Sequence, residues 1–120
     1  MHKRKLISIS ANVGHAIYSF RMGFTDCETP QFGKDACNKS LTLEDDETIT
    51  EIKICASQIR ISGIILSTNK QRDLEFIGQS KTGNWLTQKI DPQFKLVGLH
   101  GTLSASNSLA GLGFLLWRPL

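Results

Sequence analysis

The stretch ISGIILSTNKQRDLEFIG, Ile61–Gly78, begins as an apolar run, passes through a dense polar centre and closes on apolar residues again. Its first half is continuous enough in apolar residues to form a strand that is buried on both faces. The segment RDLEFIG then returns from that strand across the polar turn Asn69-Lys70-Gln71. We therefore predict a β-hairpin whose polar tip is formed by these three residues.

Strand signals of this kind recur at short intervals along the chain, and long helical periodicity is missing. In AIYSFRMGF, the large side chains Tyr18, Phe20 and Met22 fall on one face of an extended chain. In TITEIKICAS, Ile52 and Ile54 point one way and the charged residues point the other. An all-β sandwich, barrel or prism is predicted, with its strands in KLISISA, AIYSFRMGF, SLTLEDD, TITEIKICAS, RISGIILST, RDLEFIG, NWLTQKI, FKLVGLHG and LAGLGFLLWRP.

The composition predicts one compact domain spanning residues 1–120, since the 120 residues are 40% apolar. No apolar run approaches the roughly 18 to 20 residues that a membrane span needs, so none is expected. The N-terminus MHKRKLISIS has the charges of a signal peptide but no hydrophobic region behind them, and no export signal is expected in this chain. The net charge of +3 is small and diffuse, which does not favour a nucleic-acid partner.

The cysteines Cys27, Cys37 and Cys55 do not have the spacing of metal ligands, and no zinc site is expected. Cys27 and Cys37 bracket a polar loop and could close it with a disulfide in an oxidising compartment, while three reduced thiols are the alternative. The triplet Asn38-Lys39-Ser40 fits the N-glycosylation pattern, which matters only in a secreted chain.

The residue types that catalysis requires are not grouped in the sequence, so neither an enzyme nor a cofactor is predicted. The three histidines, His2, His15 and His100, are isolated from one another in the sequence. The four consecutive acids of residues 44–47 are expected to form a solvated loop rather than an acid/base pair or a calcium site. No glycine-rich phosphate loop is present, because Gly111 and Gly113 lie inside a predicted strand.

Taken in order, the segments TITEIKIC, RISGIILSTNKQRDLEFIG, FKLVGLHG and LAGLGFLLW resemble the jacalin-related lectins over Lys5 to Pro119. The terminal Trp117 and the phrase Phe76-Ile77-Gly78 are most similar to the animal zymogen-granule type lectins. The resemblance implies a β-prism of three Greek-key antiparallel sheets around a pseudo-threefold axis. The residue patterns alone favour a sandwich or a barrel, which remain the alternatives.

Two departures from that family concern its sugar-binding site. Many members begin with a Gly-rich strand, and that first strand is apparently absent here. The last loop of the family carries an Asp that accepts hydrogen bonds from two sugar hydroxyls, and Ala110 stands in its place in GTLSASNSLAGLG. Hydrogen bonds to a charged acceptor contribute roughly 1.5 to 3 kcal/mol. Ordinary mannose binding is therefore expected to be weak or absent.

The resemblance implies that a ligand lies at loops at one end of the prism. Mannose-type and sulfated glycans are the candidate ligands, and the basic residues near the hairpin tip would suit sulfate. The candidate ligand-binding residues are those of the last loop and of two turns, namely Gly101, Thr102, Leu103, Ser104, Ala105, Ser106, Asn107, Ala110, Gly14, Asn69, Lys70 and Arg72.

The first functional hypothesis is a non-catalytic, lectin-like carbohydrate-binding module. The family resemblance favours a secreted protein and is compatible with homo-oligomers. The alternative is a protein-interaction or targeting module that has lost sugar binding, as part of a larger secreted or toxin-like protein. An exposed apolar patch that includes Trp85 or Trp117 would favour a protein partner.

Overall fold

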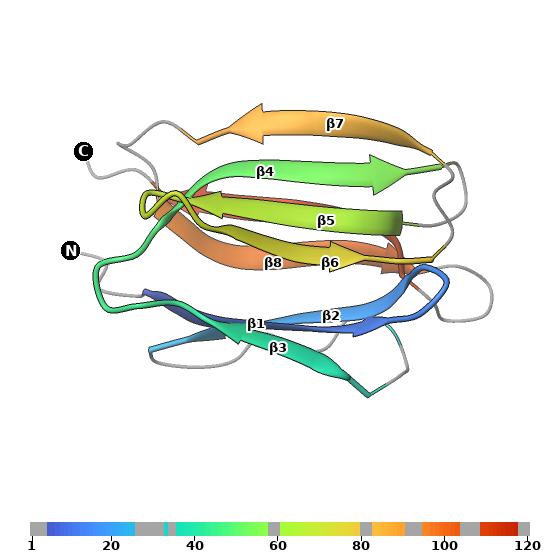
Figure 1. Cartoon of the computed structure of the whole chain (residues 1–120), viewed down its shortest axis with the longest axis horizontal. Helices are drawn as coiled ribbons and strands as arrows, with labels where there is room; N and C mark the ends of the chain where they lie inside the picture. The colour runs from blue at the N-terminus through green and yellow to red at the C-terminus, as the bar shows by residue number, and fades with distance from the viewer. Residues whose placement is uncertain are drawn as a thin grey trace.

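A computed structural model describes residues 5–25, 33, 36–57, 61–79, 83–90, 95–103 and 109–117, with side chains described up to residue 90. Every regular element in these ranges is a β-strand, and no helix there is long and apolar enough to cross a membrane. The strands are β1 (Leu6–Val13), β2 (Ile17–Phe24), β3 (Lys39–Thr42), β4 (Ile49–Ala56), β5 (Ile61–Thr68), β6 (Asp73–Ile77), β7 (Asn84–Lys89), β8 (Lys95–Leu103) and β9 (Leu109–Trp117) (Figure 1).

The strands form three antiparallel sheets, which we call A, B and C. Sheet A has the order β2-β1-β3, sheet B the order β6-β5-β4-β7, and sheet C pairs β8 with β9. In sheet B the fourth strand returns to lie beside the first, which is the Greek-key order. Each sheet contacts the other two, so the three enclose a common core (Figure 1). The prediction of an all-β prism is confirmed, and the sheets do not close into a barrel.

The hairpin at Ile61–Gly78 forms as predicted and supplies strands β5 and β6. Leu66 pairs with Leu74 in register, and Ile64 pairs with Phe76. These four side chains are almost completely buried. The prediction that this strand is buried on both faces is wrong at Ile65. That residue is only half-buried, because the other face of sheet B lies toward solvent.

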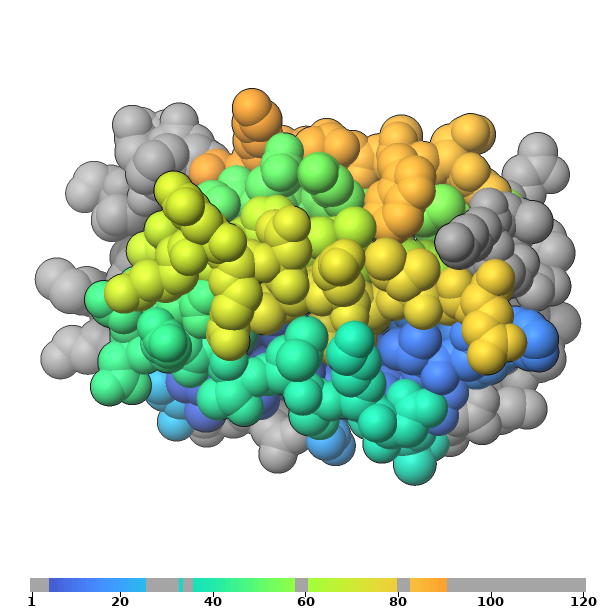
Figure 2. All heavy atoms as spheres, viewed as in Figure 1, coloured from blue at the N-terminus to red at the C-terminus, as the bar shows by residue number. Residues whose placement is uncertain are grey.

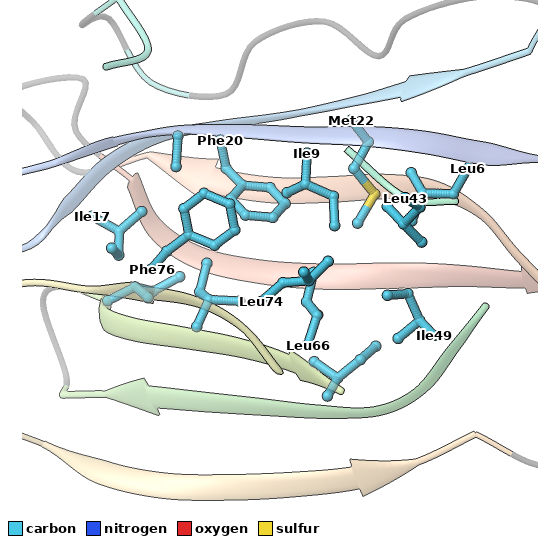
Figure 3. Packing of buried hydrophobic residues seen from close by; sticks show 14 of the residues in the cluster. Leu6, Ile9, Ile17, Phe20, Met22, Leu43, Ile49, Leu66, Leu74 and Phe76 are labelled. Atoms are coloured by element: carbon cyan, nitrogen blue, oxygen red, sulfur yellow. The ribbon is translucent and has the colours of Figure 1, made fainter. Parts of the chain in front are cut away.

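The core is built where the hairpin of sheet B meets strand β2 of sheet A. Phe20 and Phe76 have no exposed surface, and their rings meet edge to face with centroids 5.9 Å apart and planes at 76°. Figure 3 shows the two rings side by side, with Ile9 and Met22 further along the same layer. An edge-to-face pair of this kind contributes about 0.5–1.5 kcal/mol beyond the area that it buries.

The seam between sheets A and B runs along their edge strands β3 and β6, which lie side by side in Figure 2. Lys39 of β3 donates from Nζ to the carbonyl of Glu75 at 2.7 Å, and the same ammonium lies 5.6 Å from the centre of the Phe76 ring. At the other end of the seam, Arg72 donates from Nη2 to the carbonyl of Thr42 at 2.7 Å. Two basic side chains thus close the seam without a backbone ladder.

The outer face of sheet A is less exposed than its polar sequence pattern indicates. Ser19 is polar and alternates with the core residue Phe20, yet it too has no exposed surface. Gly33 lies over it, since a Cβ added at Gly33 would lie 2.8 Å from Ser19 Cα. Gly33 has a φ of 99°, which glycine adopts without strain.

Replacing Phe20 with Ala should remove the edge-to-face pair and leave a cavity between sheets A and B. We expect the free energy of unfolding to fall by about 3–5 kcal/mol, the usual range for a buried Phe→Ala change. Urea unfolding followed by circular dichroism measures it. Ile7→Ala on strand β1 is the control, because Ile7 is 41% exposed and should cost far less. Equal losses in the two variants would contradict the assigned core.

Candidate functional site

The strands run roughly along one direction, so their turns gather at two opposite ends of the molecule (Figure 1). The first, the Gly14 end, comprises the β1–β2 turn, residues 78–79 after β6, and the adjoining ends of β8 and β9. The second, the Gln71 end, comprises residues 43–48 and the β5–β6 turn at residues 69–72. Strand β6 runs from one end to the other and separates them.

At the Gly14 end, the β1–β2 turn is fastened to the chain that leaves β6. The Gly14 N–H donates to the carbonyl of Ala16 at 3.0 Å, and the Gln79 N–H donates to the carbonyl of Gly14 at 2.8 Å. A Cβ added at Gly78 would lie 2.6 Å from the carbonyl oxygen of His15. Only glycine allows this close approach, which gives a physical reason for the last residue of the Phe76-Ile77-Gly78 phrase.

Residues 36–38 brace the same turn from the side of sheet A. The Asn38 side chain accepts a hydrogen bond from the Val13 N–H at 2.9 Å and donates to the Val13 carbonyl at 3.0 Å. Asn12 donates from Nδ2 to the carbonyl of Ala36 at 2.6 Å. The amide of Asn38, in the N-glycosylation triplet, therefore acts as an extra rung of the β1–β3 ladder in the folded chain.

Strand β8 ends and strand β9 begins at the Gly14 end (Figure 1). The predicted site residues Gly101, Thr102 and Leu103 are the final residues of β8. Leu103 pairs with Leu109 and Thr102 pairs with Gly111, so Ala110 is the extra residue of an irregularity in the ladder. Such bulges redirect a side chain out of the sheet pattern. The loop residues Ser104, Ala105, Ser106 and Asn107 lie outside the described residues.

Tyr18 lies at this end, although the sequence pattern placed it only on one face of its strand with Phe20 and Met22. A Cβ added at Gly14 would lie 2.9 Å from Tyr18 Cε2, so the ring lies directly against the turn. The side chain is half-buried, in contrast to the fully buried Phe20 and Met22 of the same strand. The sequence did hold a signal for this position. Tyr18 is the second residue of β2, and the end of a strand lies nearest to the loops.

The predicted site residues Asn69, Lys70 and Arg72 lie at the Gln71 end and are engaged in contacts there. Asn69 accepts from the Thr48 N–H at 2.9 Å and donates to the carbonyl of Asp46 at 3.1 Å. Lys70 Nζ lies 2.7 Å from Asp46 Oδ2. This bond lowers the pKa of Asp46 and raises the pKa of Lys70.

Arg72 forms the strongest ion pair at this end, with a carboxylate that has no exposed surface. Its Nη2 lies 2.6 Å from Glu47 Oε1 and its Nε lies 3.0 Å from Oε2, a bidentate arrangement. Thr68 Oγ1 donates to Oε2 at 2.7 Å, and the Glu44 N–H donates to Oε1 at 3.0 Å. Burial alone would raise the pKa of Glu47, but these hydrogen bonds and the guanidinium outweigh it and lower the pKa.

Two sequence-based expectations are corrected by this arrangement. The Asn69–Lys70 turn was expected to assist the last loop together with Gly14, but strand β6 places the two turns at opposite ends. The four acids of residues 44–47 were expected to form a solvated loop, but Glu47 is buried and holds that loop to the β5–β6 turn. Within the described residues, no group of three His, Cys, Asp or Glu side chains could hold a metal ion.

The chain as a whole matches a known protein family. The family profile of the jacalin-like lectin domain matches residues 2–115. The chain therefore belongs to the jacalin-like lectin domain family, and it is a carbohydrate-binding module of the lectin class. None of the curated proteins compared with the chain matches it.

Solved structures with the same fold come from animals and plants. A prostate-specific WGA16 glycoprotein lectin has 21% identity and a TM-score of 0.80, with 97% of this chain and 84% of that chain covered. AcmJRL, a mannose-binding jacalin-related lectin from Ananas comosus, has 15% identity and a TM-score of 0.81, with 99% and 86% covered. Lamprey immune protein has 18% identity and a TM-score of 0.80, with 98% of this chain and 38% of that chain covered. At these identities the likeness concerns the fold.

Replacing Arg72 with Met should leave the Glu47 carboxylate buried without its cation. We expect the free energy of unfolding at pH 7 to fall by about 3 kcal/mol, as when one partner of a buried pair is removed. In the wild type the folded-state pKa of Glu47 is lowered, so this stabilisation is present above about pH 4.3 and is lost as the pH falls through the lower folded value. The difference between wild type and variant should therefore shrink from pH 7 to pH 3.

Denaturant titrations at the two pH values measure that difference directly. Lys70→Met is the matched control, because the Lys70–Asp46 pair is solvent-exposed and its loss should change stability little at either pH. A loss in the Arg72 variant that is as large at pH 3 as at pH 7 would show that Glu47 is not the group involved.

Proposed function

We propose that the protein binds a glycan at the Gly14 end, through the β1–β2 turn and the loop that joins β8 to β9. The observation that carries this proposal is that the β1–β2 turn, the end of β8 and the start of β9 lie at one end, while the other predicted turn lies at the opposite end. The turn is held by backbone bonds from Gln79 and by the Asn38 amide. A preorganised backbone of this kind lowers the entropic cost of binding.

A neutral, mannose-type glycan fits the described part of this end better than a sulfated one. The basic residues that would have suited sulfate, Lys70 and Arg72, lie at the Gln71 end and already bind Asp46 and Glu47. AcmJRL, whose fold this chain shares, is described as mannose-binding. The backbone, hydroxyl and amide groups of the predicted site match the hydroxyl groups of a neutral sugar.

The proposed activity is binding without catalysis. The buried carboxylate of Glu47 lies at the Gln71 end and is held in a bidentate ion pair. At the Gly14 end, the residues of the proposed site carry no carboxylate, since Ala110 occupies the family's Asp position. Affinity for a single sugar unit should consequently be low, because neutral hydrogen bonds contribute about half as much as those to a charged acceptor.

A glycan array that includes mannose-type, galactose-type and sulfated glycans tests the proposal. We expect saturable binding to mannose-type glycans, and loss of that binding when Ser104 and Asn107 are replaced with Ala. Lys70→Ala at the other end is the control and should bind like the wild type. A folded sample that binds no glycan, or one whose binding depends on Lys70 and not on the loop, would contradict the proposed site.

Replacing Ala110 with Asp should strengthen binding of a mannose-type sugar. The position is the extra residue of the bulge at the start of β9 and has no partner in the ladder register, so a carboxylate there breaks no strand pair. A charge-assisted bond in place of a neutral one predicts a gain of about tenfold in affinity. Calorimetry with methyl α-mannoside measures it, with Ala110→Asn as the uncharged control. No gain over that control would show that the carboxylate is not directed at the sugar.

A targeting or protein-interaction role within a longer protein is the second candidate. The chain covers 38% of the lamprey immune protein, so this fold occurs there as one part of a larger chain. Ala110 also favours this role, because it removes the charged acceptor of the family's sugar site. A blank glycan array from a folded sample would favour it, and a partner protein would then be sought.

A further inference from the structure

The outer face of sheet B carries an apolar row close to the Gly14 end. Trp85 of β7, Cys55 of β4, Gly63 of β5 and Ile77 of β6 stand next to one another in register across the four strands. This row lies on the face opposite to the core, because the alternating neighbours Ile64 and Phe76 point inward. Trp85 is 46% exposed and Ile77 is 42% exposed, although both are large and apolar.

The Trp85 indole lies along the sheet rather than standing away from it. A Cβ added at Gly63 would lie 2.9 Å from Trp85 Cη2 and 3.4 Å from Cζ2. Neighbouring strands are about 4.8 Å apart, so a ring that starts on β7 and reaches β5 must extend across β4. The indole therefore passes over Cys55, which is 96% buried, and its far edge lies above Gly63.

Gly63 creates the space that this arrangement requires. Any side chain there would meet the indole, and the added Cβ also lies 3.7 Å from Cys55 Cβ. Cys55 is itself held by the neighbouring strand, since Ser62 Oγ of β5 donates to the Cys55 carbonyl at 3.3 Å. The row is thus a supported aromatic surface whose ring orientation is set by the backbone of β5.

We propose that this surface is an accessory subsite that binds the C–H face of a pyranose, as part of a longer glycan held at the Gly14 end. This rests on the proposed function. A pyranose has one face of C–H groups, which the electron-rich face of an indole attracts. The row itself carries no charge, and the charged residues in the adjacent row of the same face are Lys53, which lies 3.9 Å from Glu51, and the exposed Glu75 of β6.

The position and the size of the surface both support a sugar as its occupant. Ile77 is followed by Gly78, which abuts the β1–β2 turn, so the row continues into the proposed binding end. One indole and one isoleucine offer far less than the about 800 Å² per partner that a stable protein–protein interface buries.

The test compares methyl α-mannoside with mannopentaose in calorimetric titrations. Trp85→Ala should weaken mannopentaose binding about five- to tenfold, the range of one aromatic contact, and leave methyl α-mannoside binding unchanged. Gly63→Ala keeps the indole but displaces it, and should weaken mannopentaose binding in the same direction. Leu86→Ala is the matched control, because Leu86 is 69% exposed on the opposite face of β7. Urea midpoints verify that each variant is folded.

The outcomes separate this inference from the proposed function. If Trp85→Ala binds both methyl α-mannoside and mannopentaose as the wild type does, the subsite is overturned and the loop site stands. If the Ser104 and Asn107 variants lose methyl α-mannoside while mannopentaose still depends on Trp85, both sites are supported. Absence of any sugar binding would overturn both. Self-association that Trp85→Ala abolishes, without a sugar response, would assign the surface to a second copy and overturn the inference.

Discussion

The structure depends on one constraint, that three sheets must each place a single face on the same core. The contact between Phe20 of sheet A and Phe76 of sheet B meets this requirement at the centre of the molecule. The antiparallel strands of the three sheets run along one common direction and turn at the two ends of the molecule (Figure 1). The loops are therefore sorted into two groups by the packing of the core, before any of them acquires a function.

The polar groups of the loops are paired differently at the two ends of the molecule. At the Gln71 end, the loop before β4 and the β5–β6 turn satisfy one another, with the Glu47 carboxylate enclosed by Arg72, Thr68 and a backbone N–H. At the Gly14 end, the turn is held by backbone hydrogen bonds and by the Asn38 amide. The glycan site proposed above would use this second end, and binding sites are commonly built from loops on a rigid frame.

The strands were predictable from the sequence because each one has a face on the core, which gives the alternation of Phe20 and Met22 or of Ile52 and Ile54. The predictions that were wrong concern features that depend on contacts between residues far apart in the sequence. Four adjacent acids look equivalent in the sequence, and only the position of Arg72, 25 residues further on, makes Glu47 a buried one. The sequence also did not show at which end of the molecule each turn lies. Successive hairpin turns alternate between the two ends, but the connections between sheets interrupt this alternation. The candidate loop was located by family resemblance, while the contacts of Tyr18 with Gly14 and of Trp85 with Gly63 became visible only in the structure.

The position of Lys39 has a consequence for the behaviour of the protein in concentrated solution. Strands β3 and β6 are both edge strands, and edges with unpaired backbone groups are templates for aggregation. Lys39 places a charge on the edge of β3 and occupies the carbonyl of Glu75 on the edge of β6. One side chain thus makes two sheet edges poor partners for a foreign strand. The same lysine that joins sheets A and B also helps to keep separate molecules apart.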